Sequence, residues 1–88
     1  MTWKVNFDPA AIKELRKLDP PIAKRILKYL YGHIAKLENP RSVGKALKGN
    51  LDNLWRYDIG AWRIIVSIED DKLTILCVRI GHRREVYK

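Results

Sequence analysis

Arginine and tyrosine side chains gather at the ends of strand-like segments in the last third of the chain. A guanidinium binds a phosphate through two parallel N–H bonds and stabilises negative charge that develops on it. Arg56 and Arg63 belong to neighbouring predicted strands joined by a short turn, so they can converge on one ligand. Gly81 allows the chain to turn, which would bring Arg83 and Tyr87 to the same end of the sheet.

RNA is the substrate that such a set of side chains suits. RNA can be cleaved without a metal, because its own 2′-hydroxyl can attack the adjacent phosphate. An enzyme that uses this route must orient the hydroxyl, offset the developing charge and protonate the leaving oxygen. Arginines and a tyrosine around one sheet face could perform these tasks. A basic binding face that does no chemistry has the same sequence pattern, so both interpretations stay open at this point.

Two other catalytic schemes find no support in the sequence. The acidic cluster Glu69-Asp70-Asp71 lies in a predicted hairpin turn, where carboxylates serve solvation and turn formation. The two histidines are far apart, and a lone cysteine does not make a zinc site. Ser42 and Ser67 lack the glycine context of a nucleophile elbow. We therefore expect no metal, no cofactor and no nucleophile triad.

The composition favours a small basic domain with anionic partners. Eighteen Lys and Arg against ten Asp and Glu give the 88-residue chain a formal net charge of +8. No apolar run approaches the roughly 20 residues of a membrane helix, and the N-terminus lacks the features of a signal peptide. The single cysteine, Cys77, excludes an internal disulfide and fits a buried structural thiol. We expect one cytoplasmic domain, residues 1–88, with no membrane partner.

Hydrophobic periodicity divides the chain into regular elements. In chain order these are a strand at 3–7, helices at 9–18 and 20–37, a loop at 39–53, strands at 54–59, 62–68 and 72–80, and an extended segment at 82–87. Asp-Pro pairs mark both helix starts, and the helices follow so closely that we expect an antiparallel helical hairpin. The order β-α-α-β-β-β predicts an α+β fold, in which an antiparallel sheet of about four strands carries this hairpin on one face.

The chain contains two motif segments, LWRYDIGAWRIIVSI and LCVRIGHRREVY, which follow the predicted helices and a KALKG loop in the sequence. With these features the chain resembles the RelE branch of the RelE/ParE toxin superfamily over essentially its whole length, which implies a RelE-like fold. In that family the toxin enters the ribosomal A site and cleaves the mRNA there, and a cognate antitoxin wraps around the toxin and blocks it. The resemblance implies as partners an acidic RelB-like antitoxin, the ribosome and mRNA, and operator DNA only through the antitoxin complex.

The same resemblance implies catalytic roles for four side chains of this sequence. Arg63 matches the arginine that holds the scissile phosphate, and Arg56 matches a basic position that contacts phosphate and helps to activate the hydroxyl. Arg83 matches the residue that stabilises charge and protonates the leaving oxygen, and Tyr87 matches a tyrosine that stacks on or orients the attacked nucleotide. Additional candidates for RNA or ribosome binding, for which ordinary surface or turn roles stay open, are Lys45, Lys48, Arg79, His82 and Arg84.

Asp58 departs from the family pattern, because many relatives have a second Lys or Arg on this strand face. It alternates with Arg56 along the strand, so both point to the same side of the sheet. Three roles are open: a general base, an orienting partner for Arg56 or Arg63, or a cause of reduced activity. We favour the orienting role.

Two functions without RNA cleavage also stay open. A toxin of the ParE type poisons DNA gyrase on a shared fold, and its action would induce DNA damage in place of translation arrest. A catalytically inactive module would mainly bind its antitoxin and DNA, and cells would tolerate its expression without antitoxin.

Overall fold

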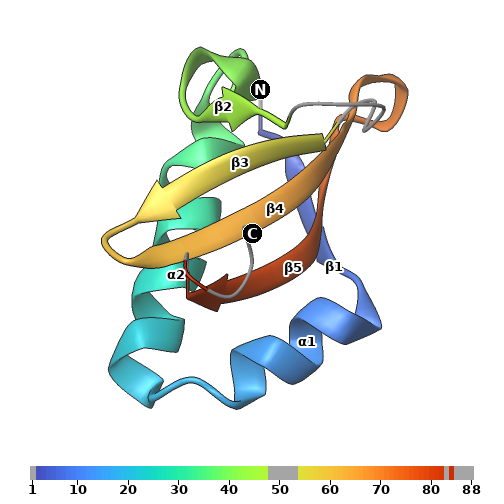
Figure 1. Ribbon diagram of the computed structural model, residues 1–88. Helices are drawn as coiled ribbons and strands as arrows, with labels where there is room; N and C mark the ends of the chain where they lie inside the picture. Colours follow the sequence, from blue (N-terminus) through green and yellow to red (C-terminus); the bar gives the residue numbers. More distant parts are fainter. Residues whose placement is uncertain (1, 48–53, 83, 85–88) are drawn as a thin grey trace.

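A five-stranded mixed sheet with the strand order β1-β5-β4-β3-β2 forms the centre of the fold (Figure 1). The computed structural model describes residues 2–47, 54–82 and 84. Its strands are β1 (Lys4–Phe7), β2 (Lys45–Ala46), β3 (Leu54–Ile59), β4 (Trp62–Glu69) and β5 (Thr74–His82). The neighbouring pairs β2–β3, β3–β4 and β4–β5 are antiparallel, whereas β1 lies parallel to β5.

The predicted α+β class is confirmed, but the sheet differs from the prediction in two ways. Among the described residues it has five strands where about four were expected, because β2 forms within the predicted loop 39–53 and pairs with the start of β3. It is also not purely antiparallel. The first and last strands are neighbours, and the long connection between them through the two helices permits a parallel pair.

β5 is shifted by two residues at both ends relative to the predicted strand 72–80. It begins at Thr74, because residues 70–72 form a 3₁₀ turn and Leu73 has a left-handed backbone with φ of 47°. It does not stop at Gly81, because β4 pairs with it as far as His82. Of the predicted extended segment 82–87, Arg84 has helical backbone, and residues 83 and 85–87 lie outside the described residues.

Two helices, α1 (Pro9–Arg16) and α2 (Pro20–Gly32), follow β1 as predicted. Asp8 caps α1, since its carboxylate accepts a hydrogen bond of 3.2 Å from the N–H of Ala10. The helices do not run back along each other as a hairpin would: α1 packs at the edge of the sheet near β1 and β5, while α2 passes behind the sheet (Figure 1).

α2 ends five residues earlier than predicted. Gly32 is its last residue, and Ile34–Lys36 continue as a 3₁₀ turn. The tighter turn buries Ile34 and Ala35 and presents the carbonyl of Ala35 to the N–H of Trp3 at 2.8 Å. Burial of the 3₁₀ turn against the rest of the protein therefore ends α2 at Gly32, a residue of low helix propensity, although the apolar stripe continues beyond it.

The core lies between α2 and the inner face of the sheet. Its fully buried side chains include Ile26 and Leu30 of α2, Ile64 of β4 and Cys77 of β5. Burial raises the pKa of the Cys77 thiol to about 12, so this side chain stays protonated at neutral pH. The prediction of a buried structural thiol is confirmed.

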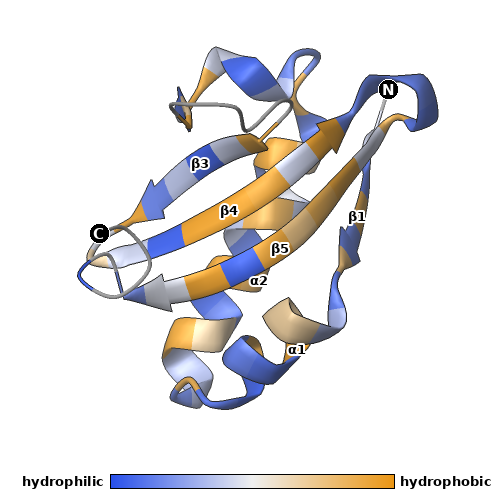
Figure 2. Cartoon of the chain, turned by 45° about the vertical axis from the view of Figure 1, so that its right-hand side comes forward, coloured by the Kyte–Doolittle hydropathy of each residue, from blue (hydrophilic) through white to orange (hydrophobic). Residues whose placement is uncertain are grey.

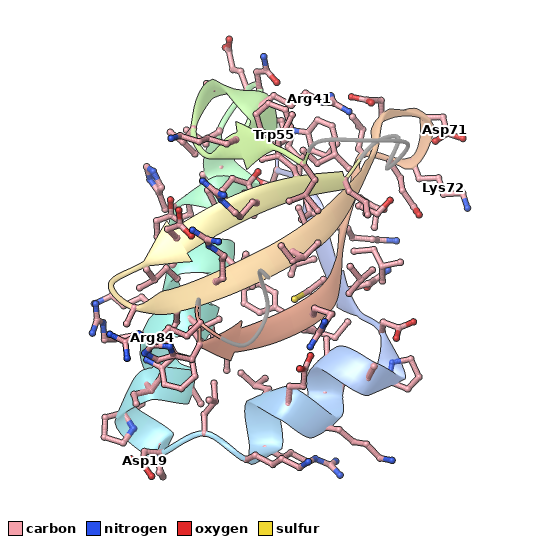
Figure 3. The ribbon with its side chains drawn as sticks, viewed as in Figure 1. Asp19, Arg41, Trp55, Asp71, Lys72 and Arg84 are labelled. Atoms are coloured by element: carbon pink, nitrogen blue, oxygen red, sulfur yellow. The ribbon has the colours of Figure 1, made fainter. Side chains whose placement is uncertain are left out.

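The segment before β2 is fastened to β3 by two aromatic side chains. The indole Nε1 of Trp55 donates to the carbonyl of Val43 at 2.6 Å, and the hydroxyl of the buried Tyr57 donates to the carbonyl of Pro40 at 2.6 Å. Figure 3 shows Trp55 between β3 and this segment. Gly44 lies at the point of closest approach, with a φ of 78°.

Gly44→Ala should lower the free energy of unfolding by about 2 kcal/mol or more. A Cβ at this position would lie 2.4 Å from the carbonyl oxygen of Arg56 and 2.8 Å from the indole nitrogen of Trp55, and the backbone is left-handed. Chemical denaturation of the two proteins measures the effect.

Gly32→Ala is the matched control for this prediction. The added Cβ at the end of α2 meets nothing closer than 3.9 Å, so we expect no loss of stability and a small gain from the better helix former. Equal stability of the Gly44 variant and wild type would contradict the proposed close packing of the segment on β3.

Candidate active site

The sheet face opposite α2 carries charged side chains near the turn between β3 and β4. Cross-strand register places Lys45 of β2 opposite Arg56 of β3, and Asp58 of β3 opposite Arg63 of β4. Directly opposed residues point to the same side of a sheet, so these four side chains share one face. Figure 2 shows hydrophilic segments of β3 and β4 near their connecting turn, and more hydrophobic colour along the middle of β4.

The β3–β4 hairpin is the local feature that brings the arginines together. Gly60 and Ala61 form the turn, and Gly60 has a φ of 58°, which glycine adopts without strain. The strand bounds and the two faces of β3 agree with the sequence prediction: Tyr57 is fully buried, whereas Asp58 is exposed. Arg56 and Arg63 therefore lie near each other because one tight turn folds β4 back onto β3.

Asp58 lies between the two arginines. The Nε of Arg63 donates to Asp58 Oδ1 at 3.0 Å, and the Nε of Arg56 lies 3.5 Å from Asp58 Oδ2. The arginine side chains are only 11% and 15% exposed, for Arg56 and Arg63 respectively, while that of Asp58 is 45% exposed. One carboxylate thus contacts both guanidinium groups through their Nε atoms, which is the geometry that the orienting hypothesis requires.

The arrangement has the chemical features of an anion site. The carboxylate of Asp58 contacts two guanidinium groups from neighbouring strands, and a phosphate oxygen can make the same kind of charge-assisted contact. The low exposure of both arginines strengthens their interaction with an anion relative to a site in open water. Lys45, exposed beside Arg56, adds a third cation on the same face.

Arg79 lies on the same face but interacts with a different element. Arg79 is opposite Ile65 of β4, and Ile65 is opposite Arg56 of β3, so the three side chains point to the same face. The guanidinium of Arg79, however, lies 3.8 Å from Glu14 Oε2 of α1. Glu14 also accepts a hydrogen bond of 2.9 Å from the N–H of Ile80. β1 pairs with β5 only as far as Cys77, and Glu14 satisfies a backbone donor beyond that point.

The sequence did not single out Glu14, which the helical periodicity places on the outer side of α1. Its role depends on a strand 66 positions further along the chain. No local pattern around Glu14 distinguishes it from an ordinary solvated carboxylate.

The end of β5 carries the other predicted cations. The ring of His82 packs edge-on against Trp62, with centroids 5.6 Å apart, and its Nδ1 accepts a hydrogen bond of 3.3 Å from the N–H of Arg84. Arg84 is exposed and lies beside the end of β5 (Figure 3). Lys48, Arg83 and Tyr87 lie outside the described residues.

Residues 2–47, 54–82 and 84 contain no group of three or more His, Cys, Asp or Glu side chains that could hold a metal ion. In the same part of the chain, neither helix is long and apolar enough to cross a membrane.

Comparison with known proteins places this chain in one class, the toxins of toxin–antitoxin systems. Residues 5–87 match the family described as the ParE toxin of the type II toxin-antitoxin system, parDE. Toxin RelG of Mycobacterium tuberculosis is 28% identical over 100% of this chain and 99% of that protein. The mRNA interferase toxin RelE of Escherichia coli is 28% identical over 99% of this chain and 92% of that protein.

A solved structure agrees with these relatives. The toxin–antitoxin complex RelBE2 from Mycobacterium tuberculosis contains a chain that superposes with a TM-score of 0.85 at 27% identity, covering 97% of this chain and 95% of that one. The chain therefore belongs to the ParE toxin family of type II toxin–antitoxin systems, as a RelE-type member of the RelE/ParE superfamily. The resemblance noted in the sequence motifs is confirmed.

Proposed function

We propose that this toxin is a cytoplasmic, single-domain, metal-independent endoribonuclease that cleaves mRNA in the ribosomal A site. The observation that carries the proposal is the convergence of Arg56 and Arg63 on one carboxylate, which marks a place where an anion can contact both guanidinium groups. The RelE relative at 28% identity is named an mRNA interferase, which supports the same chemistry.

In the proposed reaction the 2′-oxygen of the RNA attacks the adjacent phosphorus and the bond to the 5′-oxygen breaks. The products are a 2′,3′-cyclic phosphate and a 5′-hydroxyl. Arg63 holds the scissile phosphate, and Arg56 contacts phosphate beside it and helps to activate the 2′-hydroxyl. Asp58 keeps the guanidinium groups of these two arginines in place through its contacts with their Nε atoms.

Two further roles rest on the family resemblance. Arg83 offsets the charge of the pentacovalent phosphorus and directs a proton to the leaving oxygen. Tyr87 stacks on or orients the attacked nucleotide. Lys45, Lys48, Arg79, His82 and Arg84 supply further contacts with RNA or the ribosome.

An acidic RelB-like antitoxin is the proposed protein partner. The formal net charge of +8 favours an acidic partner, and the structural relative at 27% identity was solved as a toxin–antitoxin complex. Operator DNA is bound only through that complex. Purified toxin that showed no affinity for the product of the adjacent reading frame would contradict this part of the proposal.

Primer extension on a defined mRNA in a purified translation system tests the proposed reaction. We expect cuts within the A-site codon when ribosomes are present and none on the same mRNA without ribosomes. Addition of the antitoxin should abolish them. Intact mRNA from a well-folded toxin would overturn the proposal.

Gyrase poisoning is the second candidate function, and the match to the family described as the ParE toxin favours it. A gyrase poison would induce the DNA-damage response and leave translation running in the purified system. These two results together would favour gyrase poisoning over RNA cleavage as the function.

A further inference from the structure

A depression of about 430 Å³ lies between α2 and the end of β3. It is lined by Arg25, Lys28, Tyr29, Gly32, His33 and Ile59. Only Ile59 among these residues belongs to the sheet. None belongs to the group of Arg56, Asp58 and Arg63 on the other face, which we call the arginine–Asp58 cluster. The volume falls within the range of sites that hold small ligands.

Cations surround an aromatic floor in this depression. Arg25 and Lys28 of its lining are basic, and α2 contains no Asp or Glu between Pro20 and Gly32. The rings of Tyr29 and His33 lie 5.3 Å apart at an angle of 43°. Tyr29 is half-buried against the core, whereas the imidazole is exposed. Aromatic rings with adjacent cations are the combination that single-stranded nucleic acid uses, through base stacking and phosphate contacts.

The depression and the arginine–Asp58 cluster lie on opposite sides of β3, and the edge of this strand separates them. β2 pairs only with Trp55 and Arg56, so among the described residues no strand flanks Tyr57–Ile59 on that side. The guanidinium of Arg25 lies near the β3–β4 turn, since a Cβ on Gly60 would be 3.7 Å from its Nη2. A strand occupies about 4.8 Å in the plane of a sheet. A polynucleotide can therefore follow the β3 edge from one site to the other.

A second observation links the two sites electrostatically. Burial, followed by the negative charge of Asp58, raises the pKa of the Tyr29 phenol. The Asp58 carboxylate is therefore close enough to the floor of the depression for its charge to act there. The phenol stays protonated at neutral pH and presents a neutral ring to a ligand.

We propose that this depression binds one or two nucleotides of the RNA strand next to the cleaved phosphodiester. Arg25 and Lys28 contact the phosphates, and a base lies against Tyr29 and His33. This inference rests on the proposed function, since it extends the RNA path from the arginine–Asp58 cluster around the edge of β3. We favour RNA as the ligand because the lining combines the cations Arg25 and Lys28 with the rings of Tyr29 and His33, and because α2 has no acidic side chain.

The test measures the affinity of a short, fluorescently labelled, 2′-O-methyl RNA, which cannot be cleaved by its own hydroxyl. The variant is Arg25→Glu with Lys28→Glu. The matched control is Lys13→Glu with Lys72→Glu, at two exposed positions that line neither this depression nor the arginine–Asp58 face. Each replacement changes the charge by two units, so both double variants go from +8 to +4. Circular dichroism establishes that both are folded.

We expect the Arg25/Lys28 variant to bind the RNA about tenfold more weakly than the control at the same salt concentration, with a shallower salt dependence. We also expect His33→Ala alone to weaken binding, because a stacking surface is lost. Equal affinities of the two double variants would overturn the inference. Loss of antitoxin binding by the Arg25/Lys28 variant, with RNA affinity equal to that of the control, would also overturn it in favour of a protein occupant.

Ribosomal cleavage assays on the same proteins separate this inference from the proposed function. If wild type cleaves mRNA while both double variants bind RNA equally, the nucleotide site is wrong and the endonuclease stands. If wild type does not cleave but the Arg25/Lys28 variant loses RNA affinity relative to the control, the site stands and the proposed reaction is wrong.

Discussion

We expect Arg63→Ala to lower the rate of the proposed A-site mRNA cleavage by at least about 100-fold and to abolish growth arrest, which is the largest effect we expect from one substitution. Arg63 belongs to the arginine–Asp58 cluster, with its Nε 3.0 Å from Asp58 Oδ1. Its guanidinium is the group proposed to hold the phosphate that accumulates charge. The side chain lies on the sheet face opposite the core, so the fold should tolerate its removal.

Primer extension on programmed ribosomes measures the loss of cleavage, and thermal unfolding and antitoxin binding monitor the integrity of the fold. Arg16→Ala, which removes an exposed arginine from α1, is the matched control and should cleave as wild type does. The family resemblance predicts that Arg83→Ala is as inactive as the Arg63 variant. Growth arrest of normal strength from a folded Arg63 variant would contradict the proposed site.

Asp58→Ala should lower kcat about 30-fold without raising KM. The carboxylate contacts the Nε atoms of Arg56 and Arg63 at 3.5 and 3.0 Å, so its loss frees both side chains to adopt other rotamers. Small displacements of groups that position a substrate are costly for the chemical step. Binding should not weaken, because the substitution removes a negative charge from the proposed phosphate site. Single-turnover cleavage over a range of toxin concentrations gives both constants.

Asp58→Asn separates the three roles that the sequence left open for this residue. An amide oxygen can still accept from Arg63 Nε, so a positioning role predicts that Asn retains more activity than Ala. A general base would make both variants equally inactive, by about 100-fold or more. If Asp58 instead reduces activity, both variants would cleave faster than wild type.

Local signals in the sequence were sufficient for the elements that carry the arginines. The alternation of Trp55 to Ile59 and the glycine turn at residue 60 predicted β3 and its faces, and both are confirmed. The Asp8-Pro9 pair predicted the start of α1 in the same way. These predictions succeed because the information lies within a few residues of each element. Arg56, Asp58 and Arg63 are brought together by a single tight turn.

Predictions that depended on distant parts of the chain were less successful. β2 is two residues long and exposed, and the neighbouring segment is held by Trp55 and Tyr57 of β3. α2 stops at Gly32 because the following turn packs against the N-terminal segment, where Ala35 bonds to Trp3. Hydrophobic periodicity along one segment contains no information about which remote backbone will pair with it.

The sequence by itself determined the fold class and the hairpin that presents Arg56, Asp58 and Arg63 on one sheet face, because residue alternation and turn chemistry are local. The superfamily followed from the resemblance of the sequence motifs. Tertiary structure decided that Asp58 lies within contact distance of both guanidinium groups, and that Glu14 satisfies the backbone of β5 beyond the end of β1. It also decided that α2 places Arg25 and Lys28 beside the end of β3. The last two arrangements depend on the packing of helices against strands that lie far away in the sequence, such as Glu14 against Ile80, 66 positions later, which no short stretch of sequence specifies.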